Sequence, residues 1–184
     1  MKEPMHTFKL IAIASAMLAM QSAQAAPDID TAYTEFGSGS KVRMVRAGVT
    51  SDWNTRWFQS NGTHLTAYWD ASFGAWHGTR ARNIPGAHQD LVDVGLTPVL
   101  RFRRDDGLGF YAEAGIGAHL LSKKYDNNDD RLSTTFQFGD HIGVGYVFNK
   151  HWEVAVKMQH YSNGGIKKPN SGVDYGVLKL SYRF

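Results

Sequence analysis

The chain has 184 residues, no cysteine and a formal net charge of +3. This length suffices for one domain with a sizeable core, and the lack of cysteine excludes disulfides and thiol chemistry. The basic residues form no stripe with interleaved aromatic side chains, so we predict that nucleic acid is not a partner.

The N-terminal segment has the pattern of a secretory signal peptide. Lys2 and Lys9 supply positive charge, and the apolar run 10–20 is shorter than the roughly 20 residues that a membrane-spanning helix needs. Ala23-Gln24-Ala25 is a small-residue cleavage site. We therefore predict a cleaved signal peptide over residues 1–25 rather than an anchor helix.

From about residue 41 onwards, apolar and polar residues alternate with period two, which predicts β-strands. Several segments run 12 residues or more, which suits tilted membrane strands of about 9–11 residues with extensions. Residues 26–184 are predicted as one domain, in which 26–40 is a periplasmic N-terminal segment. The eight predicted strands are 41–50, 53–60, 64–77, 90–104, 109–122, 134–148, 151–162 and 173–184.

The predicted connections alternate in length. Tight turns lie at 61–62, 104–108 and 149–150, and longer polar loops lie at 78–89, 123–133 and 163–172. Outer-membrane barrels have short periplasmic turns and longer external loops, and an even strand count leaves both termini in the periplasm. Only the connection at Ser51-Asp52 is short where a long loop is expected. The fold class predicted is all-β, an eight-stranded antiparallel transmembrane β-barrel in the outer membrane of a Gram-negative bacterium.

The last predicted strand shows which face meets lipid. One face carries apolar and aromatic side chains and the other is mostly polar, as a lipid-facing wall and a barrel interior require. The apolar face holds Leu178, Leu180, Tyr182 and Phe184, and the other holds Lys179, Ser181 and Arg183. A soluble lipocalin-type barrel would show the same alternation with its apolar face inside, but the long strands and the terminal aromatic residues favour the membrane barrel.

The pair Asp140-His141 does not fit this pattern simply. One of the two side chains must face lipid if the strand 134–148 is regular. A β-bulge or a local polar patch on the outer wall would each account for the pair.

Three polar residues fall on the lipid-facing side of the last two strands. His160 and Ser162 continue the face that carries Met158, and Asp174 shares the face of Leu178. Because these strands are consecutive and antiparallel, their facing ends bring Asp174 beside His160 and Ser162. Polar groups on a lipid-facing wall cost free energy and are candidates for function.

The residue types suit acyl transfer. A serine hydroxyl becomes a nucleophile with the help of a base, and a third group holds the base in the right tautomer. Residues two apart on a strand have Cα atoms roughly 6.6 Å apart and point the same way. We predict Ser162 as nucleophile, His160 as general base and Asp174 as the orienting acid. Oxyanion donors and substrate-positioning groups are predicted at Asn163, Gly164, Gly165 and Asn170.

No metal or other cofactor is predicted. The other histidines lack the spacing of metal ligands. The acidic loop 123–131 could bind a cation through its aspartates, but we interpret it as a solvated loop.

The stretch HYSNGGIKKPNSG, residues 160–172, followed by Asp174, resembles the PagL family of outer-membrane lipid A 3-O-deacylases. The resemblance extends over most of the mature chain, including RWF, AYWD, FGDHIGVGY and the C-terminal strand. It implies a barrel with a Ser-His-acid triad on its outer surface, and hydrolysis of the 3-hydroxyacyl ester at position 3 of lipid A without a cofactor. The implied partners are lipopolysaccharide and outer-membrane lipid, and a homodimer is left open.

One position departs from the family pattern. The acid of the family can be Glu, whereas this chain has Asp174, which is one methylene shorter. Glu153 is the only acidic alternative in the preceding strand, and it is predicted to face the interior. The resemblance also implies that Asn163, Gly165 and Asn170 belong to the surroundings of the catalytic pair, including its oxyanion hole.

Three other functions are alternatives to a deacylase. An outer-membrane phospholipase also has His-x-Ser-Asn-Gly on its outer wall, but it uses an amide, calcium and about twelve strands, more than this chain supplies. A structural or adhesive barrel would leave the outward-facing triad unexplained. A pore is excluded because eight strands leave an interior that side chains fill.

Overall fold

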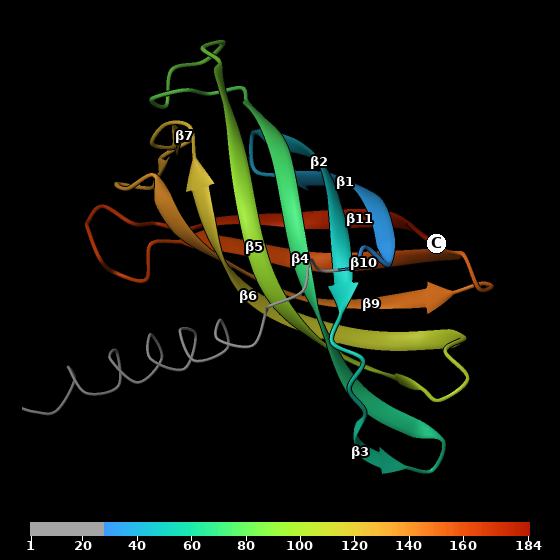
Figure 1. Cartoon of the computed structure of the whole chain (residues 1–184). Coiled ribbons are helices and arrows are strands. Elements are labelled where there is room, and N and C mark those ends of the chain that lie inside the picture. Colours follow the sequence, from blue (N-terminus) through green and yellow to red (C-terminus); the bar gives the residue numbers. More distant parts are fainter. Residues whose placement is uncertain (1–27) are drawn as a thin grey trace, which may run out of the picture.

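The computed structural model describes residues 28–184, so the predicted signal peptide lies outside the described residues. Eight long antiparallel strands form one closed barrel, because β2 pairs with β4 as well as with β1 (Figure 1). The predicted eight-stranded fold is confirmed. No helix among residues 28–184 is both long and apolar enough to cross a membrane.

The barrel strands are β1 (Thr31–Gly39), β2 (Val42–Asp52), β4 (Thr63–Gly78), β5 (Gln89–Arg104), β6 (Gly109–Leu121), β9 (Phe136–Val147), β10 (Trp152–Ser162) and β11 (Val173–Arg183). Three short strands lie outside this ring: β3 (Trp57–Ser60), β7 (Asp126–Asn127) and β8 (Asp130–Arg131). β3 pairs with β4 and extends beyond one end of the barrel, while β7 and β8 pair with each other (Figure 1).

The prediction for the first part of the chain was wrong in two places. Residues 31–39, assigned to the periplasmic segment 26–40, form β1, which closes the barrel between β2 and β11. The segment 53–60 is not a barrel strand, since β2 continues to Asp52 and only the short β3 follows. The physical reason is that the outer face of β1 carries one large apolar side chain, Phe36, so its hydrophobic alternation is weak, and the strand is defined by its pairing with β2 and β11.

The two ends of the barrel differ in their connections. One end, here called the loop end, carries the segments 79–88, 122–135 and 163–172 together with the tight turn at Ser40-Lys41. The other end carries the turns 105–108 and 148–151 and the longer connection 53–62 with β3, and it also holds Thr31, which pairs with Arg183. The start of β1 and the end of β11 therefore lie at the end opposite the loops 79–88, 122–135 and 163–172.

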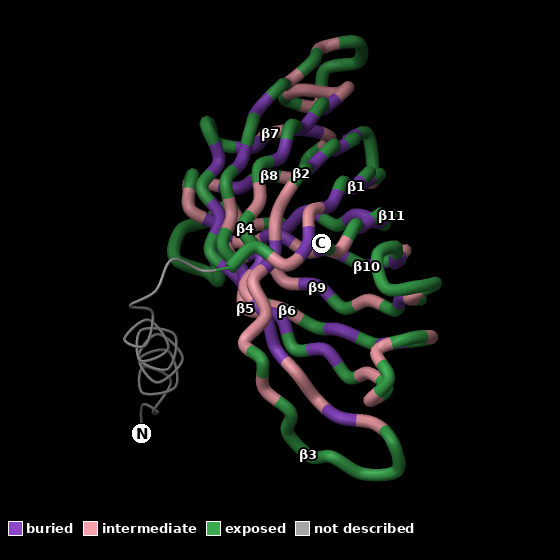
Figure 2. The backbone as a smooth tube through the Cα atoms, turned by 45° about the vertical axis from the view of Figure 1, so that its right-hand side comes forward, coloured by how far each residue is buried: buried purple, intermediate pink, exposed green. Residues whose placement is uncertain are grey.

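Exposure alternates along each barrel strand, as the colour bands of Figure 2 show. Phe110 is 75% exposed while its neighbour Tyr111 is 4% exposed, and Leu178 is 50% exposed beside Lys179 at 1%. The predicted faces are confirmed. Because the apolar side chains cover the outside, the lipocalin-type alternative is wrong and the outer wall has the character of a lipid-facing surface.

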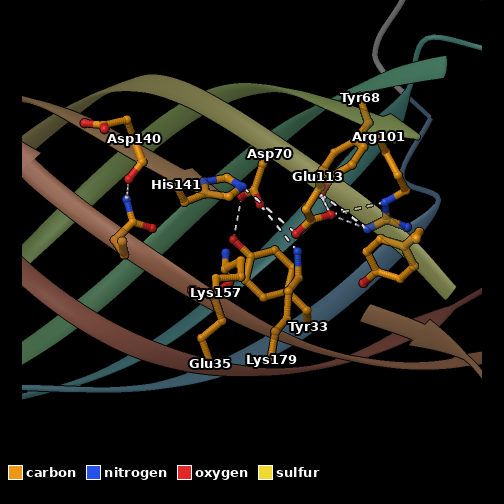
Figure 3. Close-up of polar contacts among 12 residues, drawn as sticks. Tyr33, Glu35, Tyr68, Asp70, Arg101, Glu113, Asp140, His141, Lys157 and Lys179 are labelled. Atoms are coloured by element: carbon orange, nitrogen blue, oxygen red, sulfur yellow. Dashed lines mark hydrogen bonds and ion pairs between the residues drawn. The ribbon is translucent and has the colours of Figure 1, made fainter. Parts of the chain in front are cut away.

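Ion pairs fill part of the barrel interior (Figure 3), and a buried apolar and aromatic cluster around Trp76, Tyr161 and Tyr175 fills the part toward the loop end. Arg101 lies 2.9 Å from both Glu113 and Glu153, and Glu35 contacts Arg46 and Lys157. Buried charges require such partners, because an unpaired charge in this environment is strongly destabilising.

Candidate active site

His160 and Asp174 lie directly opposite each other on the outer wall, at the loop end of β10 and β11. Nδ1 of His160 is 2.6 Å from Oδ1 of Asp174. The two side chains are 40% and 72% exposed, so the pair faces outward and not into the barrel. Because Nδ1 is engaged by the carboxylate, Nε2 is the ring nitrogen left to exchange a proton with a substrate-side group.

Ser162 is the last residue of β10 and lies two positions beyond His160 on the same face. It is partly exposed, and its register partner on β9 is Phe138. Within residues 28–184, its hydroxyl makes no hydrogen bond with the imidazole. Contacts between a nucleophile and its base often tighten only when substrate binds.

Asn163 organises the loop that follows Ser162. Its side chain is fully buried, Nδ2 donates to the carbonyl of Lys167 at 2.6 Å, and Oδ1 accepts from the N–H of Gly165 at 3.0 Å. Its own backbone N–H donates to Oδ1 of Asn170 at 3.0 Å. The backbone N–H groups of Asn163 and Gly165 are therefore occupied within the loop.

The same bonds leave two donors of the predicted oxyanion hole free. Oδ1 of Asn170 accepts a backbone N–H, so its Nδ2 group points elsewhere and can donate. The N–H of Gly164 has no hydrogen-bond partner within the described part of the chain. Gly164 and Gly165 have φ values of +62° and +80°, a left-handed conformation that glycine adopts without penalty.

The neighbouring loop 122–135 holds the loop 163–172 in place. Leu132 forms a β-bridge with Asn170, and the Ser133 hydroxyl donates to the carbonyl of Pro169 at 2.6 Å. The backbone of Arg131 exchanges two further hydrogen bonds with Ser171. The position of Asn170 is thus determined by a segment that is remote from it in sequence.

Two further residues lie at the site, although the sequence analysis did not assign Gly172 or Asp140 to it. Gly172 packs against the imidazole of His160 and has a φ of +85°. Asp140 lies opposite His160 on β9, so Asp140, His160 and Asp174 form a row across the outer wall. The signal that could have indicated Gly172 was its place two residues before the predicted acid Asp174. For Asp140, the signal was the predicted tight turn at 149–150, since a short turn fixes the register of the two strands it joins and brings residue 140 opposite residue 160.

The register of β9 also resolves the question of Asp140-His141. His141 is 6% exposed and points inward, and Asp140 is partly exposed and lies apart from the interior cluster (Figure 3). The pairing of β9 with β6 and β10 is continuous across both residues. A bulge is therefore excluded, and the two residues simply occupy opposite faces, with Asp140 in a polar patch on the outer wall.

A groove of about 670 Å³ lies beside this row. Apolar side chains of the outer wall line most of it, and the polar residues of its lining include Asp140, His160 and Asp174. The apolar outer-wall residues are Pro98, Leu100, Ala114, Ile116, Ile142 and Met158. Among residues 28–184, no three His, Asp or Glu side chains are arranged to hold a metal ion. The site thus combines an ionisable pair with an apolar groove open to the membrane side.

Comparison with known proteins identifies the family. A family model described as "Lipid A 3-O-deacylase (PagL)" matches residues 43–183. The chain is 33% identical to "Lipid A deacylase PagL" of Pseudomonas aeruginosa over 174 residues, which cover 95% of this chain and 94% of the relative. It is also 33% identical to the protein of the same name from Bordetella bronchiseptica over 180 residues, 95% of each chain.

Solved structures agree with these matches. The crystal structure of "the outer membrane enzyme PagL" superposes with a TM-score of 0.71 at 28% identity, covering 82% of this chain and 97% of that one. The N-terminal barrel of Pseudomonas aeruginosa OprF, at 13% identity and a TM-score of 0.52, shares the fold alone. The chain therefore belongs to the PagL family of lipid A 3-O-deacylases, which are ester hydrolases built as outer-membrane β-barrels.

Proposed function

We propose that this protein hydrolyses the ester-linked 3-hydroxyacyl chain at position 3 of lipid A, with Ser162, His160 and Asp174 as its catalytic triad. The observation that carries the assignment is the 2.6 Å contact between His160 Nδ1 and Asp174 Oδ1, on the outer wall and two residues from Ser162. Relatives named lipid A deacylase support the substrate class.

The contact between His160 and Asp174 supports the following reaction. Oγ of Ser162 attacks the ester carbonyl while Nε2 of His160 takes the proton of the Ser162 hydroxyl. Asp174 stabilises the imidazolium that forms. The N–H of Gly164 and Nδ2 of Asn170 donate to the oxyanion. When the acyl carbon–O3 bond breaks, the imidazolium gives its proton to the departing O3 of the sugar, which leaves as a hydroxyl and leaves the acyl group on Ser162. Water, activated by the same histidine, releases the acyl chain from Ser162, and no cofactor takes part.

The position of the triad suits a substrate that stays in the membrane. The apolar groove is lined by His160 and Asp174 and lies on the outer wall, so an acyl chain in it would approach the pair from outside the barrel, and Ser162 follows two residues after His160. Lipid A lies in the outer leaflet, so the loop end is assigned to the cell exterior and both ends of the mature chain to the periplasm. The proposed partners are lipopolysaccharide and outer-membrane lipid. Dimer formation remains a prediction.

The phospholipase alternative is disfavoured by two observations. The barrel has eight strands rather than about twelve, and the residue that contacts His160 is a carboxylate rather than an amide. A purely structural barrel would gain nothing from an exposed imidazole–carboxylate pair, since such surface pairs contribute little to stability.

The test is mass spectrometry of lipid A after incubation of lipopolysaccharide with the detergent-solubilised protein, without added calcium. Loss of one 3-hydroxyacyl chain from position 3 is expected for the parent and not for Ser162→Ala. Unchanged lipid A together with calcium-dependent release of fatty acid from phospholipid would replace this proposal with the phospholipase. Equal activity of the parent and Ser162→Ala would reject Ser162 as the nucleophile.

A further inference from the structure

The charges around the triad are unfavourable for an anionic substrate. Asp140 and Asp174 flank His160 on the outer wall. The pKa of Asp130, in the neighbouring loop, is raised first by its partial burial and next by the negative charge of Asp174. Asp130 thus adds a third carboxyl group to this region. Lipid A is a phosphorylated glucosamine disaccharide, so its head group is repelled by these carboxylates unless cations lie nearby.

Lys167 and Lys168 are the basic residues nearest in sequence to the nucleophile. Both are exposed, and neither forms an ion pair within residues 28–184. They belong to the loop end, and they follow Ile166, which is 64% exposed. An exposed apolar residue beside two ammonium groups is suited to the boundary between acyl chains and phosphate head groups.

The backbone of this pair is hydrogen-bonded on both sides. The carbonyl of Lys167 accepts from the buried side chain of Asn163, which directly follows Ser162. On the other side, the carbonyl of Pro169 accepts from the Ser133 hydroxyl. The lysine pair is thus bracketed by two short hydrogen bonds of 2.6 Å each.

We propose that Lys167 and Lys168 form a phosphate-binding subsite that holds a phosphate group of lipid A while its acyl ester lies at Ser162. This inference rests on the proposed deacylase function and adds the head-group chemistry that the enzyme recognises. Two ammonium groups on a bracketed loop attract a phosphate through charge-assisted hydrogen bonds. They also offset the repulsion from Asp140 and Asp174.

A second lysine pair in the same chain provides a matched control. Lys123 and Lys124 are likewise exposed at the loop end without an ion pair among the described residues, but they follow β6 instead of the nucleophile strand. The variants to compare are Lys167→Gln/Lys168→Gln and Lys123→Gln/Lys124→Gln. Each removes two charges from the loop end, so a general electrostatic effect at the membrane surface would be the same for both.

Binding is measured in the inactive Ser162→Ala background, with fully phosphorylated lipid A and with the same lipid A after removal of its phosphates. Lys167→Gln/Lys168→Gln is expected to weaken binding of the phosphorylated form about tenfold and to reduce its dependence on salt. Binding of the dephosphorylated form is expected not to change. In the active enzyme, hydrolysis of the neutral ester 4-nitrophenyl hexanoate is expected to stay at the parental rate.

Three outcomes would contradict the proposed phosphate-binding subsite. They are equal weakening by the Lys123/Lys124 variant, equal weakening for dephosphorylated lipid A, and loss of hydrolysis of the neutral ester. If lysine-dependent binding of phosphorylated lipid A is found while the parent removes no acyl chain, the phosphate subsite stands and the proposed reaction fails. The two proposals are therefore tested separately.

Discussion

Gly172 lies so close to His160 that a Cβ atom at position 172 would fall 2.5 Å from Cε1 of the imidazole. The backbone of Gly172 has a φ of +85°, which side chains rarely adopt. The residue thus serves two purposes. It turns the chain into β11, and it leaves the space in which the imidazole meets Asp174.

Gly172→Ala is therefore expected to displace the imidazole and to lower kcat/KM by about 100-fold, as misplacements of about 1 Å in active sites do. The matched control is Gly176→Ala, because a Cβ at Gly176 on the outer face meets no atom within 4 Å. Activity is measured by mass spectrometry of lipid A. Folding is measured by the difference in gel migration between the unheated and the heated protein. Parental activity of a folded Gly172→Ala protein would contradict the role given to this contact.

Substitution of Asp174 by Glu is expected to preserve activity, and substitution by Asn is expected to abolish most of it. Asp174→Asn removes the charge that stabilises the imidazolium and permits the wrong tautomer, so a fall in kcat of about 10²–10⁴-fold is expected. Asp174→Glu keeps the carboxylate, and its exposed position gives the longer side chain room to adjust. Its kcat/KM is expected to stay within about tenfold of the parent. If Asp174→Asn turns over like the parent, Asp174 is not the acid.

The contact between Ser133 and Pro169 is expected to affect catalysis rather than folding. Ser133→Ala removes one hydrogen bond that holds the loop carrying Asn170, which corresponds to about 1 kcal/mol and a fall in kcat of about fivefold. KM for the neutral ester is expected to stay constant. Ser122→Ala is the control, since the Ser122 hydroxyl accepts from the backbone of Val92 on another strand. Equal effects of the two variants would show that the loop contact has no special role.

The buried charges are expected to govern the stability of the barrel. Glu35→Gln leaves Arg46 and Lys157 without their shared carboxylate, which is expected to lower the free energy of unfolding by about 3–5 kcal/mol. Replacing Lys157 by Met in the same protein is expected to restore part of that loss. The measurement is urea-induced unfolding in lipid vesicles. If the midpoint of urea unfolding is unchanged in Glu35→Gln, the charges of Arg46 and Lys157 are stabilised by water and not by Glu35.

The sequence by itself determined which residues face lipid and which candidates share a wall. Alternation with period two placed His160 and Ser162 on one face, and the antiparallel connection placed Asp174 on the strand beside them. These conclusions hold because side-chain direction in a strand depends only on position along the chain. The eight-strand count was also right, although one of the predicted strands was wrong.

Only the tertiary structure decided where the barrel begins and how the loop around Asn163 is arranged. β1 was missed because Phe36 is the one large apolar side chain on its outer face, so the strand is revealed only by its pairing with β2 and β11. The donors left free for the proposed oxyanion hole depend on Asn170, which accepts the N–H of Asn163 and is bridged to Leu132 of another loop. Such contacts join segments that are distant in sequence, whereas the register of β9 and β10 is local because a short turn connects the two strands.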